Sequence, residues 1–254
     1  MNKKLLILSA VLLIIILLVP VEALAQEFQF PEINFEISPA GEEGEPEDLV
    51  LSLRILLILT VITLAPAILI LVTSFTRIII VFSIIKRALA LQNMPPNQVL
   101  IGLAIFLTVF IMAPVWQDIN TNAVQPYIEE EIATETAVDN TVSPLRDFMF
   151  SQTDEKSLSL FVNLSGIEQP ENRDDIPTHV LIPAFIMHEL KIAFQIGFII
   201  YIPFIMIDMV VASILMSMGM LMLPPVIISL PFKILLFVLV DGWYLLIESL
   251  IKTF

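Results

Sequence analysis

The chain contains no cysteine among its 254 residues, which excludes disulfide bonds, thiolate metal sites and cysteine nucleophiles. Its two histidines, His179 and His188, are nine residues apart, a spacing that does not match a metal-binding motif such as H-E-x-x-H. The seven glycines form neither a P-loop nor a G-x-G-x-x-G motif. We therefore expect no catalytic site, no bound metal, no cofactor and no binding of nucleic acid.

Basic residues are scarce, with 12 lysines and arginines against 26 aspartates and glutamates. Segments 27–48 and 117–178 hold 8 and 13 of these acids, whereas segment 73–98 holds no acid. Because positive charges mark the cytoplasmic side of inner-membrane proteins, we place 73–98 in the cytoplasm and the acidic segments, as a solvated surface, in the periplasm. The basic residues of 73–98 are Arg77, Lys86 and Arg87.

The N-terminus predicts a cleaved secretory signal peptide over residues 1–25. Lys3 and Lys4 form its charged region, Leu5–Val19 its apolar core and Ala23–Ala25 its A-x-A cleavage site. The alternative is a first transmembrane helix that stays attached. An acidic periplasmic linker over 26–48, rich in Glu, Pro and Gly, is expected to follow and to be poorly ordered.

Long apolar runs dominate the remainder of the chain, which is 57% hydrophobic where soluble domains are about 45–50% apolar. The pattern predicts a first apolar helical pair with a basic cytoplasmic turn over 49–116. It further predicts a small acidic helical periplasmic domain over 117–178 and apolar helices over 179–254. The fold class is therefore an all-α integral membrane protein of long hydrophobic helices and helical hairpins.

One apolar run, Val180–Leu223, is too long for a single span. As a straight helix it would measure roughly 66 Å, about twice the hydrocarbon thickness of a bilayer. We expect an interruption at Pro203, and hence two helices, a hairpin, or an element that projects well beyond the bilayer.

Two local signals place helix ends within 117–178. Ser143 followed by Pro144 predicts the start of one helix. Thr153 and the two acidic residues after it predict the start of another, which Gly166 would end. The buried face of this second helix is predicted to be Leu158, Phe161 and Val162.

Ionisable residues inside apolar segments are the most informative feature. Residues 183–198 read PAFIMHELKIAFQIGF, and such groups cost roughly 2.5–3.5 kcal/mol each at membrane depth unless they face a partner or a cavity. Asp208 with Lys233 is the favoured pair. Two interpretations stay open: a proton or ion path through Glu189 and Asp208, or structural salt bridges that fix the register of helices or subunits. The buried charges assigned to helix pairing are Glu189, Lys191, Asp208, Lys233 and Asp241.

Methionine occupies every second position near residue 220, in the sequence SILMSMGMLMLPP. That period would scatter the side chains around a helix, and Gly219 with the following Pro224-Pro225 indicates a loop or a broken helix. Methionine is flexible and apolar, so several such loops meeting at an axis would make a deformable seal. The alternative is ordinary apolar filler at a helix end. The methionines are Met216, Met218, Met220 and Met222.

Four sequence blocks cover most of the chain after residue 50. They are SFTRIIIVFSIIKRALALQ at 74–92, PPNQVLIGLAIFLTVFIMAP at 95–114, PAFIMHELKIAFQIGF at 183–198 and MSMGMLMLPPVIISLPFKILLFVLVDGW at 216–243. These blocks resemble the FliP family of flagellar type III secretion export-gate proteins. The linker and much of 117–178 lie outside the resemblance.

The resemblance implies a homo-oligomer, a pentamer, that assembles with FliQ-like and FliR-like subunits into a closed helical cone largely above the bilayer plane. FlhB-like and FlhA-like export components are further implied partners, and unfolded flagellar export substrates pass along the axis. The methionine-rich loop acts as the gasket in this family. Energy coupling is attributed to other subunits, which favours the structural interpretation of the buried charges. The predicted signal peptide and acidic extension favour the flagellar branch over the virulence-type branch.

The expected function is a pore-forming subunit of the flagellar export gate, located in the bacterial inner (cytoplasmic) membrane at the flagellar basal body. Two rival functions remain at this stage. One is a proton-coupled small-solute transporter that uses Glu189, Asp208 and Lys233. The other is an assembly scaffold that nucleates the secretion apparatus but lines no path.

Overall fold

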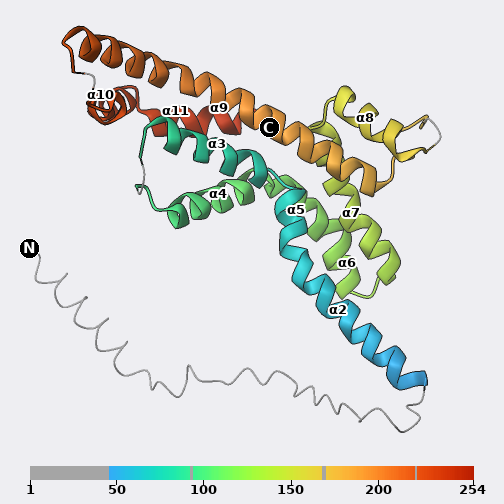
Figure 1. Ribbon diagram of the computed structural model, residues 1–254. Coiled ribbons are helices and arrows are strands. Elements are labelled where there is room, and N and C mark those ends of the chain that lie inside the picture. The colour runs from blue at the N-terminus through green and yellow to red at the C-terminus, as the bar shows by residue number, and fades with distance from the viewer. Residues whose placement is uncertain (1–45, 92–93, 168–169, 221) are drawn as a thin grey trace, which may run out of the picture. The chain divides into compact units, whose positions relative to one another are not determined.

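The computed structural model describes residues 46–91, 94–167, 170–220 and 222–254, with side chains from residue 52 onward. Every regular element in these ranges is a helix, so the all-α prediction is confirmed (Figure 1). The predicted signal peptide and nearly all of the linker lie outside the described residues. The chain divides into two units, 1–57 and 58–254, and the described part of the first is the beginning of α2 (Pro46–Leu71).

The second unit holds the remainder of α2 and all the other described elements. These are α3 (Phe75–Ala88), α4 (Asn97–Ile111), α5 (Ala113–Ile119), the π-helical turn η2 (Asn120–Val124), α6 (Gln125–Ile128), α7 (Thr134–Ser151), α8 (Glu155–Ser165), α9 (Thr178–Ser217), α10 (Pro225–Leu239) and α11 (Gly242–Ile251).

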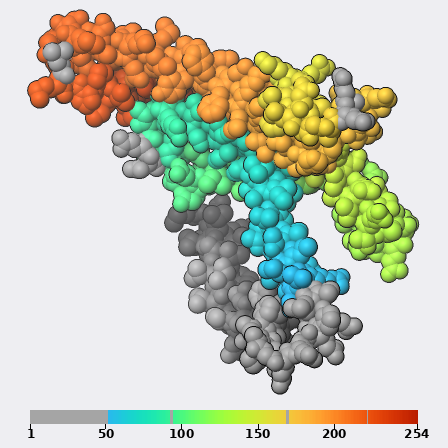
Figure 2. All heavy atoms as spheres, turned by 45° about the vertical axis from the view of Figure 1, so that its right-hand side comes forward, coloured from blue at the N-terminus to red at the C-terminus, as the bar shows by residue number. Residues whose placement is uncertain are grey.

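Helix α9 is the element against which α3, α7, α8 and α10 pack. Its first turns contribute Val180, Leu181 and Phe185 to a core shared with α7 and α8. Figure 2 shows α8, in yellow, lying against α9, in orange. Further along, Ala193 and Phe204 enter a second core with α3, α4, α10 and α11. One helix thus organises both cores of the second unit.

The 40 residues of α9 form one continuous helix that contains both Pro183 and Pro203. At 1.5 Å per residue it is about 60 Å long, twice the hydrocarbon thickness. The expected interruption at Pro203 is therefore wrong, and the run is one element longer than a bilayer is thick. Proline is tolerated inside apolar helices where neighbouring groups satisfy the freed carbonyl.

The boundaries of α8 follow the predicted signals. The Asp154 side chain accepts a hydrogen bond from the Ser157 backbone N–H at 2.9 Å, and Gly166 ends the helix with a φ of +68°. Val162 is buried and Leu158 and Phe161 pack against the same core, as predicted. The predicted helix start at Ser143-Pro144 is wrong, because these residues lie inside α7, which begins at Thr134.

Two helices are long and apolar enough to cross a membrane, Ser52–Leu71 and α9. Two bent helix pairs raise the number to four if each pair is one span. In one pair Asn97–Ile111 is followed by Ala113–Ile128 at 58°, and in the other Pro225–Leu239 is followed by Gly242–Ile251 at 62°. The described residues therefore contain two to four candidate spans.

The second unit leaves large apolar side chains exposed on several helices. On α4, Phe106 is 76% exposed and Phe110 65%, and on α9, Ile199 is 67% exposed. Soluble monomers rarely expose such continuous apolar surface, so these faces require lipid or partner chains.

Candidate functional site: the charged contacts of α9 and the methionine turn

Glu189 of α9 and Arg77 of α3 form a fully buried ion pair. Arg77 is 2% exposed and Glu189 0%. The Arg77 Nε donates to Glu189 Oε2 at 2.9 Å, and Arg77 Nη2 donates to Glu189 Oε1, which makes the contact bidentate. Such a geometry gives the strongest kind of charge-assisted hydrogen bond.

Arg77 also joins two other segments to this pair. Its Nη1 donates to the Thr253 backbone carbonyl at 2.8 Å, and its Nη2 donates to the Gln152 side-chain carbonyl at 3.1 Å. The Phe254 ring lies 3.9 Å from the guanidinium carbon. All these contacts converge on one guanidinium, so Arg77 ties α3, α9, the end of α7 and the segment after α11 together.

Sequence reasoning missed this role of Arg77, which it counted only as a cytoplasmic positive charge. The available signal was a lone arginine just before the apolar run IIIVFSII, together with a lone glutamate in an equally apolar segment. Two opposite charges in apolar surroundings are expected to find each other.

The predicted pair of Asp208 and Lys233 is present. Lys233 is 2% exposed, and its Nζ lies 2.6 Å from Asp208 Oδ2. The same ammonium donates to the Ala88 backbone carbonyl at 3.1 Å, and the Ser229 hydroxyl donates to Asp208 Oδ1. The pair therefore connects α9 with α10 and with the C-terminal end of α3.

Lys191 and Asp241 differ from the prediction that both are buried. Lys191 is 47% exposed and binds Asp154 at 2.7 Å, because it extends from α9 to the N-terminus of α8. This ammonium, with the Ser157 hydrogen bonds, holds the pKa of the Asp154 carboxyl well below its usual range. Asp241 is exposed and adopts the left-handed conformation at the bend between α10 and α11.

His188 lies beside the same contact, with Nδ1 3.2 Å from Asp154 Oδ1. In the part of the chain that the structure describes, no group of three or more His, Cys, Asp or Glu side chains could hold a metal ion. The charged groups of α9 thus form separate pairs with α3, α8 and α10.

The methionine-rich segment forms the turn between α9 and α10, as the loop prediction required. Helix α9 ends at Ser217, Gly219 adopts a φ of +74°, and α10 begins at Pro225. Met218 is 63% exposed and Met222 98%, while Met216 and Met220 are also exposed. The four side chains are therefore available to contact other chains or a passing substrate.

A model of the FliP family matches residues 58–250, which contain both buried ion pairs and the methionine turn. The chain belongs to the FliP family. It is 56% identical over 211 residues to the flagellar biosynthetic protein FliP of Bacillus subtilis. The matched region covers 83% of this chain and 96% of that protein.

Two further FliP relatives come from distant bacteria. The flagellar biosynthetic protein FliP of Treponema pallidum is 51% identical over 228 residues, covering 89% of this chain and 83% of that protein. The FliP of Aquifex aeolicus is 46% identical over 228 residues, covering 89% of this chain and 92% of that protein. The resemblance carried by the four sequence blocks is thereby confirmed.

Proposed function

We propose that this FliP-family protein is a pore-forming subunit of the flagellar type III export gate in the bacterial cytoplasmic membrane. The observation that carries the proposal is the exposed methionine turn at the end of α9. Several copies arranged around an axis would bring these turns together, and flexible apolar side chains would close on one another when no substrate is present.

The assembly part of the proposal is supported by the exposed apolar faces of α4, α9 and α10. A ring of copies, with FliQ-like and FliR-like subunits, would cover surfaces that one chain leaves open. The 40-residue α9 suits a cone that extends beyond the bilayer plane. In this arrangement the acidic region 117–178 packs in the upper, periplasmic part of the cone, and unfolded flagellar proteins pass along the axis.

The charged pairs support a structural role rather than a proton path. Glu189 is held by two hydrogen bonds from Arg77, and Lys233 is bound by Asp208 and by a backbone carbonyl. Buried charges with fixed partners specify how helices align. Coupling to an energy source then belongs to FlhA-like and FlhB-like partners.

The proposal is tested by replacing methionines of the turn in the assembled gate. The double variant Met218→Ala and Met222→Ala removes the two most exposed side chains of the turn. We expect leakage of small ions through the closed gate, reduced secretion of flagellar proteins, or both, with an unchanged mass of the purified complex.

The matched control is Met206→Ala with Met209→Ala, two methionines in the body of α9 that are 61% and 66% exposed. These changes are expected to leave ion tightness intact. If all four methionines of the turn can be replaced by alanine without any change in ion flux or secretion, the sealing role is wrong and a scaffold function is favoured.

A further inference from the structure

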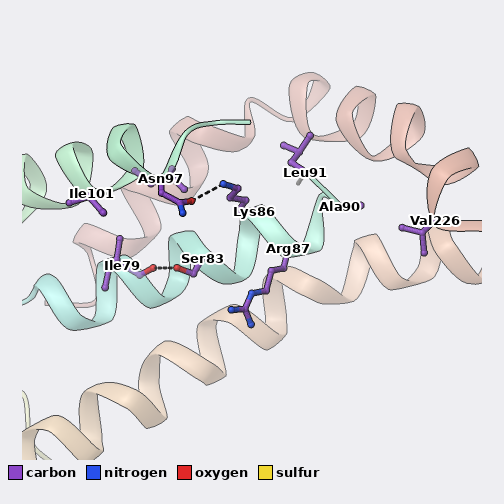
Figure 3. Close-up of a pocket in the computed structure, with 10 residues that line it drawn as sticks. Ile79, Ser83, Lys86, Arg87, Ala90, Leu91, Asn97, Ile101 and Val226 are labelled. Atoms are coloured by element: carbon purple, nitrogen blue, oxygen red, sulfur yellow. Dashed lines mark hydrogen bonds between the residues drawn. The ribbon is translucent and has the colours of Figure 1, made fainter. Parts of the chain in front are cut away.

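A pocket of about 710 Å³ opens where α3, α4 and the start of α10 approach one another (Figure 3). Apolar side chains form much of its wall: Ile79 and Ile101 lie at one end and Val226 at the other, and Leu100 also lines it. Lys86 and Arg87 bring two positive charges to it, and no acidic side chain lines it among the described residues. The pocket therefore combines an apolar wall with an uncompensated cationic edge.

The positions on α3 follow helical spacing. Ile79, Ser83 and Arg87 are four residues apart and lie along one face, and Lys86 borders the same face. In Figure 3 the Lys86 side chain turns toward Asn97, whereas Arg87 extends away from it. The two cations thus approach the pocket from different directions.

Lys86 is held in place but retains donor capacity. Its Nζ donates to the Pro95 backbone carbonyl at 3.0 Å and to Asn97 Oδ1 at 2.8 Å. An ammonium has three donors, so one remains for a ligand. Arg87 is exposed and forms no ion pair within the described ranges.

The N-terminus of α4 adds to the positive potential at this place. Its N-cap is Pro96, which supplies no side-chain hydrogen bond, and Asn97 of the first turn lines the pocket. The first N–H groups of a helix lack internal partners and attract negative charge. Two cations and a helix N-terminus therefore border the same pocket, Lys86 beside Asn97 and Arg87 on the opposite side of α3.

We propose that this pocket binds the phosphate group of an anionic phospholipid, whose acyl chain lies against the apolar wall. The last turn of α3 carries Lys86 and Arg87, which the positive-inside rule places at the cytoplasmic surface. That leaflet is rich in anionic lipids, and basic pockets between membrane helices bind their head groups. The proposal depends on the membrane position of this turn and not on the pore function.

The test measures lipid binding to the purified full-length complex by native mass spectrometry. Phosphatidylglycerol and phosphatidylcholine are added separately, and inorganic phosphate is then added as a competitor. We expect phosphatidylglycerol to be retained in preference to phosphatidylcholine. Arg87→Gln should weaken retention about fivefold, the effect of one basic residue near an anionic surface. Arg87→Lys should restore most of it.

Lys252→Gln is the matched control, because it also removes one exposed positive charge but lies outside the pocket. It should leave lipid retention unchanged. Equal retention of the two lipids, equal weakening by the control, or displacement of the lipid by equimolar inorganic phosphate would overturn the proposal. Loss of a co-purified protein chain from Arg87→Gln, with lipid retention unchanged, would instead assign the pocket to an acidic segment of a partner.

Discussion

At the residue scale, the principal feature is one buried arginine whose charge is neutralised by one buried glutamate. Arg77 and Glu189 are 112 positions apart, yet they meet with almost no solvent exposure. The desolvation of both charges is costly, so the pair serves alignment of α3 with α9 more than net stability. Removing one partner leaves the other charge buried and unpaired.

Glu189→Gln is expected to lower the free energy of unfolding of the complex by about 3–5 kcal/mol, because Arg77 stays charged and buried. The control is Glu248→Gln, which breaks the exposed pair with Lys252 and should cost less than about 1 kcal/mol. Thermal unfolding of the purified complex measures both. A loss of secretion by Glu189→Gln in a complex of unchanged stability would instead support the proton-path interpretation.

The contact between Asp154 and Lys191 predicts a pH dependence. The pKa of Asp154 is lowered in the folded protein, so the ionised carboxylate stabilises the folded state. This stabilisation is complete above the pKa of the unfolded chain, about 3.9, and is lost as the pH falls from there toward the folded pKa. The protection factors of the α8 amides, which correct for the pH dependence of intrinsic exchange, should therefore be constant from pH 7 to about pH 5 and should fall below about pH 4.

Asp154→Asn should abolish the loss of α8 stability at low pH. The helix cap should remain, because asparagine is an equally good N-cap residue. Asp174→Asn, at an exposed position, is the control and should retain the acid dependence. An identical pH profile for Asp154→Asn and the unaltered protein would show that the Lys191 contact does not stabilise α8.

At the element scale, α3 and α9 pack closely against each other. Gly197 of α9 faces Ile84 of α3, and a Cβ at this position would overlap Ile84 Cδ1 and lie 3.2 Å from Ile84 Cβ. The absence of a side chain therefore sets the distance between the two helices. The ion pairs at Glu189, fully buried, and at Asp208, partly buried, flank this contact on α9.

Gly197→Ala is expected to cost about 1–3 kcal/mol through overpacking of this interface, measured by thermal unfolding of the complex. Ile84→Ala in the same chain should relieve part of the cost, because it removes the overlapping atoms. Gly102→Ala on α4 is the control. Nothing lies within 4 Å of its Cβ position, so it should be neutral or slightly stabilising.

At the scale of the whole molecule, exposed apolar surface dominates the second unit. Lipid can cover part of it, but the proposed gate requires that copies of the chain and small apolar partners cover the remainder.

Expression with the neighbouring flagellar genes should yield a large, stable ring in mild detergent that contains two small apolar partner chains. Expression of the chain alone should yield aggregated or heterogeneous material, because its apolar faces lack their partners. The mass of each purified sample and the identity of its co-purified chains show whether the ring forms only when the partners are present. A stable monomer or dimer without partners would contradict the export-gate proposal.

The sequence by itself determined the features that depend on neighbouring residues. The all-helical fold, the capped ends of α8 and the turn at Gly219 follow from local propensity and turn chemistry. The pairing of Asp208 with Lys233 was also predictable, because two lone opposite charges in adjacent apolar runs have few other partners.

Only the tertiary structure decided which distant groups meet. The partner of Glu189 is Arg77, and that of Lys191 is Asp154 on the loop before α8. The continuity of α9 through Pro203 and the placement of Ser143-Pro144 inside α7 were likewise not predicted. The physical reason is that packing against neighbouring helices overrides local signals, and contacts between residues far apart in the chain leave no short-range pattern.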